Sequence, residues 1–281
     1  MIGQLNRILE LEKLKSSQLV KKSNKVVAFT SGKGGTGKSF LSLNIAFSLA
    51  KVGKKILLID FDPNLSNLNI MMNKRAEKNI SSFILQKELL ADLITQYNQN
   101  LHIIFGESGK VDFPAISQGI INNLILQIQS LEQQYDYVFI DTGSGAGDEL
   151  LHLLSLCDTK IIVATPEPTA VMDAYVIVKL LKSRNSAQKI GVIINRAATS
   201  SEAINAYGNL SKAINHFLKV DISYCGTINF DAAISKSIIA QELFLERFSK
   251  GETVEAITRC AKEITKFSQV VNIDHNTKNL R

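Results

Sequence analysis

A glycine-rich segment near the start of the chain contains the residue types that hold phosphate groups. Residues 31–39 read SGKGGTGKS and match the pattern G-x-x-x-x-G-K-[ST] at Gly32, Gly37, Lys38 and Ser39. Glycines let backbone N–H groups close around phosphate oxygens, and the start of a following helix adds a positive dipole. Lys38 would neutralise the β- and γ-phosphates, and the Ser39 hydroxyl would bind Mg²⁺. The segment therefore predicts a site for a nucleoside triphosphate with Mg²⁺.

Aspartates end two apolar runs further along the chain. Residues 59–62 read IDFD and residues 139–141 read FID, so that Asp60, Asp62 and Asp141 all fall at expected strand ends. Ligands of open α/β sheets bind at the carboxyl ends of the strands. Each aspartate taken singly is also compatible with an ordinary strand-terminal cap. Their occurrence together with the phosphate loop favours one shared site.

Short apolar runs alternate with longer segments of helical length. Seven runs are expected to form strands: 25–30, 55–60, 101–105, 137–141, 159–165, 189–195 and 221–228. Those at 56–59 and 190–194 are continuously apolar, which is typical of strands buried on both faces of a parallel sheet. Crossover helices are expected at 37–52, 116–133, 169–183 and 200–218. The predicted fold class is α/β: a single doubly wound, mostly parallel sheet of about seven or eight strands with helices on both faces.

The formal net charge of +6 lies at the two ends of the chain. Residues 1–25 carry a net charge of +4 and residues 265–281 a net charge of +2, whereas the other 239 residues hold 23 positive and 23 negative side chains. A nucleic-acid-binding surface usually makes a domain basic. The balanced body therefore argues against nucleic acid as a partner.

The cysteine, histidine and hydropathy patterns exclude several classes of protein. The three cysteines show no C-x-x-C spacing and the four histidines form no ligand cluster, so neither a disulfide framework nor a structural metal site is expected. No run approaches the roughly 18–20 apolar residues of a membrane span, and no signal-peptide pattern opens the sequence. We expect a cytoplasmic protein, or one peripheral to the inner face of the cell membrane.

A second lysine inside the phosphate loop points to a family. The spelling KGGTGKS at 33–39 resembles the deviant Walker A motif of the MinD/ParA ATPases, and the resemblance extends over about residues 25–265. In that family the first lysine reaches across a sandwich dimer to the partner's nucleotide. The resemblance implies that Lys33 couples ATP binding to homodimer formation and supplies charge during phosphoryl transfer. The alternative is a solvated surface lysine.

The acidic segments resemble the switch motifs of the same family. Residues 59–68 resemble its D-x-D switch I, which implies that Asp60 supports the metal and phosphate site and that Asp62 orients the attacking water. Residues 139–145 resemble a Walker B motif merged with switch II, which implies that Asp141 holds Mg²⁺ through water and Gly145 lies near the γ-phosphate.

Two later segments resemble the parts of the family that contact the base. Asn195-Arg196 resembles an N-R motif whose Asn hydrogen-bonds adenine; a turn-forming Asn is the alternative. Residues 226–231 occupy the position of an I-P-x-D loop, with Asn229 in place of the proline. The residues implied to bind ATP are Gly32, Lys33, Gly34, Gly35, Thr36, Gly37, Lys38, Ser39, Phe40, Asp60, Gly145, Asn195 and Arg196. Those implied for catalysis are Lys33, Lys38 and Asp62, and those for Mg²⁺ are Ser39, Asp62 and Asp141.

Three stretches resemble one branch of the family, the FlhG (YlxH) regulators of flagellar number and placement. They are residues 105–109, 141–147 and 165–175, the last reading TPEPTAVMDAY. This implies a dimerising switch with slow ATP hydrolysis, whose partners are an FlhF-type SRP GTPase, flagellar switch proteins and a membrane surface. Three alternatives stay open: a ParA-type DNA- or cargo-positioning ATPase, favoured by the DFDP spelling at 60–63, a MinD-type division-site regulator, and a nucleotide-binding scaffold without turnover.

The two ends of the chain are expected to lie outside the ATPase domain of residues 25–268. Residues 1–24 form a basic tail or a short partner-binding helix that contacts the FlhF-type GTPase, and residues 269–281 form a C-terminal tail. Just before that tail, apolar residues recur at helical spacing from Val254 to Val271. This segment is either an amphipathic membrane helix or a helix packed on the domain.

Overall fold

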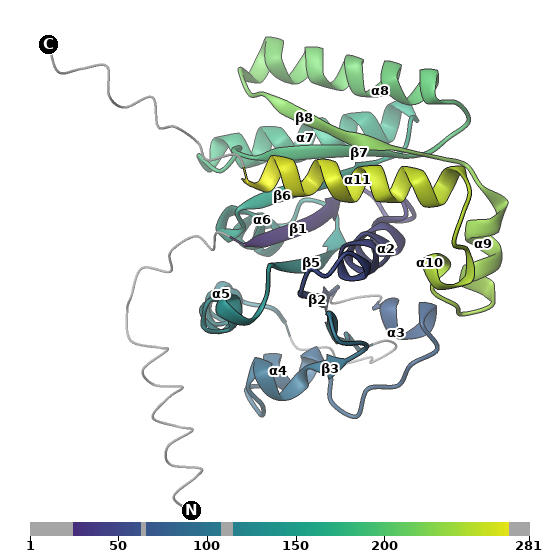
Figure 1. Ribbon diagram of the computed structural model, residues 1–281. Helices are drawn as coiled ribbons and strands as arrows, with labels where there is room; N and C mark the ends of the chain where they lie inside the picture. The colour runs from purple at the N-terminus through teal and green to yellow at the C-terminus, as the bar shows by residue number, and fades with distance from the viewer. Residues whose placement is uncertain (1–24, 63–65, 108–114, 270–281) are drawn as a thin grey trace, which may run out of the picture.

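Eight strands form one sheet at the centre of the computed structural model, which describes residues 25–62, 66–107 and 115–269 (Figure 1). Their order across the sheet is β3-β4-β2-β5-β1-β6-β7-β8. The strands are β1 (Val26–Ser31), β2 (Ile56–Phe61), β3 (Thr95–Gln96), β4 (Leu101–Ile104), β5 (Tyr137–Ser144), β6 (Thr159–Ala164), β7 (Ile190–Ala197) and β8 (Ile222–Asn229). Neighbours pair in parallel except for β3, which pairs antiparallel with β4 at one edge. The predicted mostly parallel α/β sheet is confirmed.

All seven runs predicted from the sequence form strands, with ends within three residues of those expected. The strand that was not predicted, β3, has two exposed residues and therefore no apolar run to detect. The continuous apolar runs have a direct cause in the packing. In β1, Val26 and Ala28 belong to the core on one face of the sheet, whereas Val27 and Phe29 belong to the core on the other. Both faces are buried, so both sets of alternating positions are apolar.

Helices cover both faces of the sheet (Figure 1). One face carries α2 (Lys38–Lys51), α3 (Leu68–Met71), α10 (Phe244–Arg247) and α11 (Glu252–Gln269). The other carries α4 (Ile80–Ile84), α5 (Gln118–Leu131), α6 (Asp148–Leu156), α7 (Pro168–Ser183) and α8 (Ser200–Ala213). The remaining helices are α9 (Ala232–Ile239), the short 3₁₀ turns η1 (Leu90–Leu93) and η2 (Glu132–Gln134), and a π-helix, η3 (Ile214–Leu218). The four predicted helices are present as α2, α5, α7 and α8, and α8 continues into η3.

The strand order brings the predicted site residues to one edge of the sheet. β5 lies between β1 and β2, and the register pairs Asp60 of β2 with Asp141 of β5. The phosphate loop leaves the end of β1 on the other side of β5 and leads into α2. β1 is also where the chain's crossovers change direction, because the path proceeds to β2 on one side and later to β6 on the other. Ligands of open α/β sheets bind at such a switch point.

The helix near the C-terminus packs on the domain. Ile257, Cys260 and Ile264 of α11 are fully buried in the core that α11 shares with α2 and β8. Of the two alternatives for this segment, the structure therefore shows the packed helix as far as Gln269; Val271 lies outside the described residues. In the ranges that the structure describes, no helix has both the length and the apolar character needed to cross a bilayer.

This packing can be tested by truncating a buried α11 side chain. We expect Ile264→Ala to lower the free energy of unfolding by about 2–5 kcal/mol, because the change removes apolar contacts and leaves a cavity. Urea denaturation of the full chain measures this loss. Lys262→Ala, on the exposed side of the same helix, should change the free energy by no more than about 0.5 kcal/mol. Equal stability of Ile264→Ala and the parent chain would contradict the packed arrangement.

Candidate nucleotide-binding site

A pocket of about 420 Å³ opens at the edge of the sheet where the predicted site residues gather. Its walls come from the loop at 31–40, the residue after β2, α3, the end of β7, the loop at 229–231 and α9. Ten of the predicted residues line it: Gly34, Gly35, Thr36, Gly37, Lys38, Ser39, Phe40, Asp62, Asn195 and Arg196. The sequence signals at 31–40, 60–62 and 195–196 thus meet in one cavity.

The phosphate loop needs glycine at positions fixed by its neighbours. Gly37 has a φ of 86°, and a Cβ there would come within 2.2 Å of the Asn195 side-chain nitrogen. A Cβ on Gly32 would come within 2.3 Å of the Asp173 Cβ in α7. Gly35 also has a positive φ, of 79°. A left-handed backbone and close packing exclude larger residues, which leaves the loop amides free to surround an anion.

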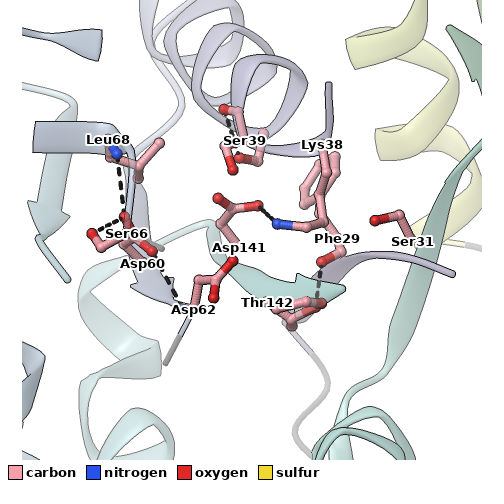
Figure 2. Close-up of polar contacts among 12 residues, drawn as sticks. Phe29, Ser31, Lys38, Ser39, Asp60, Asp62, Ser66, Leu68, Asp141 and Thr142 are labelled. Carbon is pink, nitrogen blue, oxygen red and sulfur yellow. Dashed lines mark hydrogen bonds and ion pairs between the residues drawn. The ribbon is translucent and has the colours of Figure 1, made fainter. Parts of the chain in front are cut away.

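A buried ion pair lies under the loop (Figure 2). Lys38 Nζ donates to Asp141 Oδ1 at 2.8 Å, and the two side chains are 7% and 1% exposed. Ser39, the residue after Lys38 at the start of α2, lines the pocket. The second carboxylate oxygen, Asp141 Oδ2, is buried and has no hydrogen-bond partner among the described residues. Such an orphaned acceptor is costly unless a further donor or cation arrives.

Asp60 lies on the strand next to Asp141, and two nearby donors fix the position of its carboxylate. Ser66 Oγ donates to Asp60 Oδ2 at 2.6 Å, and the Leu68 N–H donates to the same oxygen at 3.2 Å. Burial and, second, the nearby Asp141 charge raise the pKa of Asp60 from 3.8 to about 7, although the hydrogen bonds oppose both effects. Asp60 and Asp141 are thus two buried carboxyl groups close enough to influence each other, and only Asp141 is paired with a lysine.

The donor set fits Mg²⁺ shared with phosphate oxygens rather than a metal held by protein alone. Within the described part of the chain, no group of three or more His, Cys, Asp or Glu side chains could enclose an ion. Mg²⁺ binds through one or two protein oxygens and keeps its remaining positions for water and phosphate. The Ser39 hydroxyl and the orphaned Asp141 oxygen match that pattern.

Lys33 points away from its own pocket and is held by the connection between β6 and α7. Its Nζ forms a short ion pair with Glu167 and lies 3.3 Å from Thr169 Oγ1. This ion pair lowers the pKa of Glu167, first through the hydrogen bond and then through the lysine charge. Since both partners are partly exposed, the pair contributes little to stability. The lysine can therefore exchange this partner for another at low cost.

The N-R pair at the end of β7 contacts the phosphate loop directly. Asn195 Nδ2 donates to the Thr36 carbonyl at 2.7 Å, and Arg196 Nη1 donates to the Gly35 carbonyl at 3.1 Å. Asn195 Oδ1 is buried and, among the described residues, accepts no hydrogen bond. Asn195 thus uses one of its two amide N–H groups within the protein and keeps a buried carbonyl oxygen as an acceptor. A base with an exocyclic amine would satisfy it.

The other predicted residues border the pocket rather than line it. Asp60 and Asp141 lie fully buried beneath it, Gly32 and Lys33 face α7, and the Gly145 N–H donates to the Ser31 carbonyl at 2.8 Å. Phe40, at the start of α2, is among the lining residues, but its side chain is buried in the core. Its ring packs edge-on against Phe244, with the ring centroids 5.7 Å apart.

Sequence reasoning missed the apolar part of the wall. Ile70 of α3, Phe230, and Ile234 and Ile238 of α9 all line the pocket. In the sequence the loop at 226–231 stands out only because Asn229 replaces a proline, and α9 is too short for a clear periodic pattern. An apolar residue directly after a strand end, as Phe230 follows β8, is the one signal that points to this wall.

Fold and site together define a P-loop NTPase: a doubly wound sheet with a phosphate loop after β1 and acidic residues at the ends of β2 and β5. The family model that matches the chain, described as "ParA: NUBPL iron-transfer P-loop NTPase", covers residues 22–265. The chain belongs to the ParA/MinD family of P-loop NTPases, which are ATPases.

Named relatives fall within the same family. The chain is 27% identical to the antiactivator FleN of Pseudomonas aeruginosa over 239 residues, 85% of each protein. It is 30% identical to the flagellum site-determining protein YlxH of Helicobacter pylori over 251 residues, 89% of this chain and 84% of YlxH. Among solved structures, the septum site-determining protein MinD of Pyrococcus horikoshii, complexed with Mg-ADP, superposes with a TM-score of 0.71 at 22% identity and covers 87% of this chain and 97% of its own.

The raised pKa of Asp60 predicts a pH-dependent stability. Between pH 3.8 and about 7 the folded chain keeps a proton that the unfolded chain has lost, so the free energy of unfolding falls as the pH rises through this range. We expect Asp60→Asn to flatten this fall. Urea denaturation across that pH range, in EDTA and without nucleotide, measures the slope. Glu149→Gln, an exposed change on α6, should retain the parent slope, and an unchanged slope in Asp60→Asn would contradict the assignment.

Proposed function

We propose that this chain is an ATP-dependent dimerising switch that regulates flagellar number or placement. The observation that carries the proposal is the similarity to YlxH and FleN over more than four fifths of each protein, and a pocket lined by ten of the predicted site residues supports it. The segment at 165–175, whose spelling resembles the FlhG branch, supports it. Its Glu167 holds the lysine that distinguishes this family's phosphate loop.

The site residues have separate roles in this proposal. The loop amides from Gly34 to Ser39 hold the phosphates of ATP, and Lys38 exchanges Asp141 for the β- and γ-phosphate oxygens. Ser39 and Asp141 hold Mg²⁺, which neutralises phosphate charge when bound. Asp62 contributes to the metal site and orients the attacking water. Catalysis of this kind depends on positioning and charge rather than on a covalent step.

Dimerisation follows from Lys33 in the same scheme. In the single chain the lysine bonds to Glu167 and Thr169, outside its own pocket. In a face-to-face homodimer it would instead reach the phosphates of the partner subunit, where the negative charge is greater. ATP binding would thereby join two subunits, and slow hydrolysis would separate them.

Partner contacts are assigned to the ends of the chain. We assign residues 1–24 to an FlhF-type GTPase, and other surfaces to flagellar switch proteins and a membrane. Both terminal segments lie outside the described residues, and α11 uses its apolar side within the domain. A 1–24 peptide that leaves GTP turnover by the GTPase unchanged would remove the first contact. Equal liposome flotation in ATP and ADP would remove the membrane contact.

Three substitutions separate nucleotide binding from dimerisation. Lys38→Ala should abolish nucleotide binding, since it removes the main phosphate-binding charge. Lys33→Ala should bind ATP but stay monomeric, and Asp62→Ala should accumulate as an ATP-bound dimer because hydrolysis stalls. Size-exclusion chromatography with light scattering, in ATP and in ADP, measures the state of each variant.

Lys262→Ala is the matched control for the two lysine changes, since it removes an exposed positive charge on α11, away from the pocket. It should dimerise like the parent chain. An Asp62→Ala variant that remains monomeric in saturating ATP would contradict the sandwich dimer.

A cellular experiment tests the flagellar role. Deleting the gene should change the number or position of flagella, as counted by electron microscopy. A gene carrying Lys38→Ala should fail to restore the parent count, because the switch cannot bind ATP, whereas Lys262→Ala should restore it. Normal flagella in the deletion strain, combined with ATP-dependent DNA binding or with altered division sites, would favour the ParA-type or MinD-type alternative.

A further inference from the structure

The turn after β4 packs against the segment that follows β2. It begins the FGESG stretch at 105–109, to which the proposed function assigns no role. A Cβ on Gly106 would lie 2.4 Å from Ser66 Oγ, 2.6 Å from Ser66 Cβ and 3.1 Å from Asp60 Cγ. Glycine is the residue that allows so close an approach of the backbone to other atoms. Gly106 therefore leaves the space in which Ser66 meets Asp60.

The hydroxyl group of Ser66 holds the carboxyl group of Asp60 (Figure 2). Ser66 Oγ donates to Asp60 Oδ2 at 2.6 Å, and the two residues are 1% and 0% exposed. Hydrogen bonds to a carboxylate at this length are roughly twice as strong as those between neutral groups. Because both residues are buried, bulk water does not compete for the bond.

The same carboxyl group also binds two backbone amides on either side of the connection from β2 to α3. Its Oδ2 accepts from the Leu68 N–H at the start of α3, at 3.2 Å, and its Oδ1 accepts from the Asp62 N–H at 3.4 Å. Asn67, the N-cap residue of α3, makes no side-chain cap hydrogen bond, so Asp60 supplies the acceptor at this helix start. Asp62 and residues of α3 line the nucleotide pocket. One buried carboxyl group thus fixes two parts of the pocket wall relative to β2.

We propose that Ser66 is a positioning residue for ATP hydrolysis: its hydroxyl group fixes the Asp60 carboxyl group, which in turn fixes Asp62. The inference rests on the proposed ATP hydrolysis and adds to it Ser66 and the glycine that accommodates it. Ser66 does not line the pocket, so it acts through Asp60 and not on the nucleotide. Without the hydroxyl group, Asp60 loses the shortest of its three hydrogen bonds. A displacement of about 1 Å in a group that orients a reactant can slow a reaction roughly 100-fold.

Phosphate release from ATP and calorimetric binding of Mg-ADP by the full-length chain test this role. Ser66→Ala should lower kcat roughly 10- to 100-fold but leave KM and the Kd for Mg-ADP within about twofold, because the phosphate loop is unchanged. Ser66→Cys, which has a similar size and a weaker donor, should have an intermediate kcat. A serine that only supported the fold would change rate and affinity together.

Ser81 provides the matched control. It is 3% exposed and donates to Asn79 Oδ1 at the same distance of 2.6 Å, and its hydroxyl group contacts Asn79 and Glu107 rather than Asp60. Ser81→Ala should therefore keep the parent kcat and affinity.

Two further variants test the route of the effect. In Gly106→Ala the added Cβ should displace the Ser66 hydroxyl group and reproduce the loss of kcat without a change at residue 66. Ser66→Ala combined with Asp62→Ala should hydrolyse ATP within about twofold of Asp62→Ala alone, since residues that act through one another are not additive. A clear further loss in the double variant would contradict a role through Asp62.

The remaining outcomes separate this inference from the proposed function. A parent-like kcat in Ser66→Ala, measured beside a parent chain that hydrolyses ATP, overturns the role of Ser66 and leaves the proposed function intact. Equal losses of kcat and of Mg-ADP affinity also overturn it, because they indicate a disturbed pocket. If the parent chain binds ATP without hydrolysing it, the proposed hydrolysis and the role of Ser66 both fail.

Discussion

The buried contact between Lys38 and Asp141 is the interaction on which the site depends. Buried charges are tolerated only with partners, and here Lys38 is paired with Asp141 while the buried carboxyl of Asp60 lies on the neighbouring strand. Burial and, second, the Asp141 charge raise the pKa of Asp60, and one oxygen of Asp141 has no donor among the described residues. A site with this unbalanced charge attracts a cation. In the proposed function, Mg²⁺ bound together with the nucleotide would supply that cation, and the phosphates would give Lys38 new acceptors.

The packing of the sheet stabilises the strand ends that carry the buried carboxyl groups. Asp60 and Asp141 are paired in register on neighbouring strands, and the apolar residues that precede them are buried on both faces. Helices α2 and α11 cover one face and α5 to α8 the other, so that the strand ends are fixed while their polar residues meet the pocket. The apolar cores on the two faces stabilise the fold, and the buried charged side chains lie together at the edge of the sheet formed by the strand ends.

Two side chains near the pocket, Lys33 and Phe230, are held in different ways. At the phosphate end, Lys33 is held by a partly exposed ion pair with Glu167 that another anion can replace. Phe230 also lines the pocket; its N–H donates to the Ala197 carbonyl while its side chain remains exposed. The ion pair of Lys33 is therefore easier to replace than the backbone hydrogen bond that fixes Phe230.

The sequence by itself determined the class of protein, because the informative signals are local. A loop that must surround phosphate needs glycines at fixed spacing, and strands buried on both faces must be continuously apolar; both patterns are readable along the chain. Contacts between distant residues were decided only by the tertiary structure. Lys33 meets Glu167 across 134 positions and Asn195 meets Thr36 across 159. The packing of α11 and the placement of Phe230 depend on the same long-range folding, since helical spacing shows an apolar side but not what covers it.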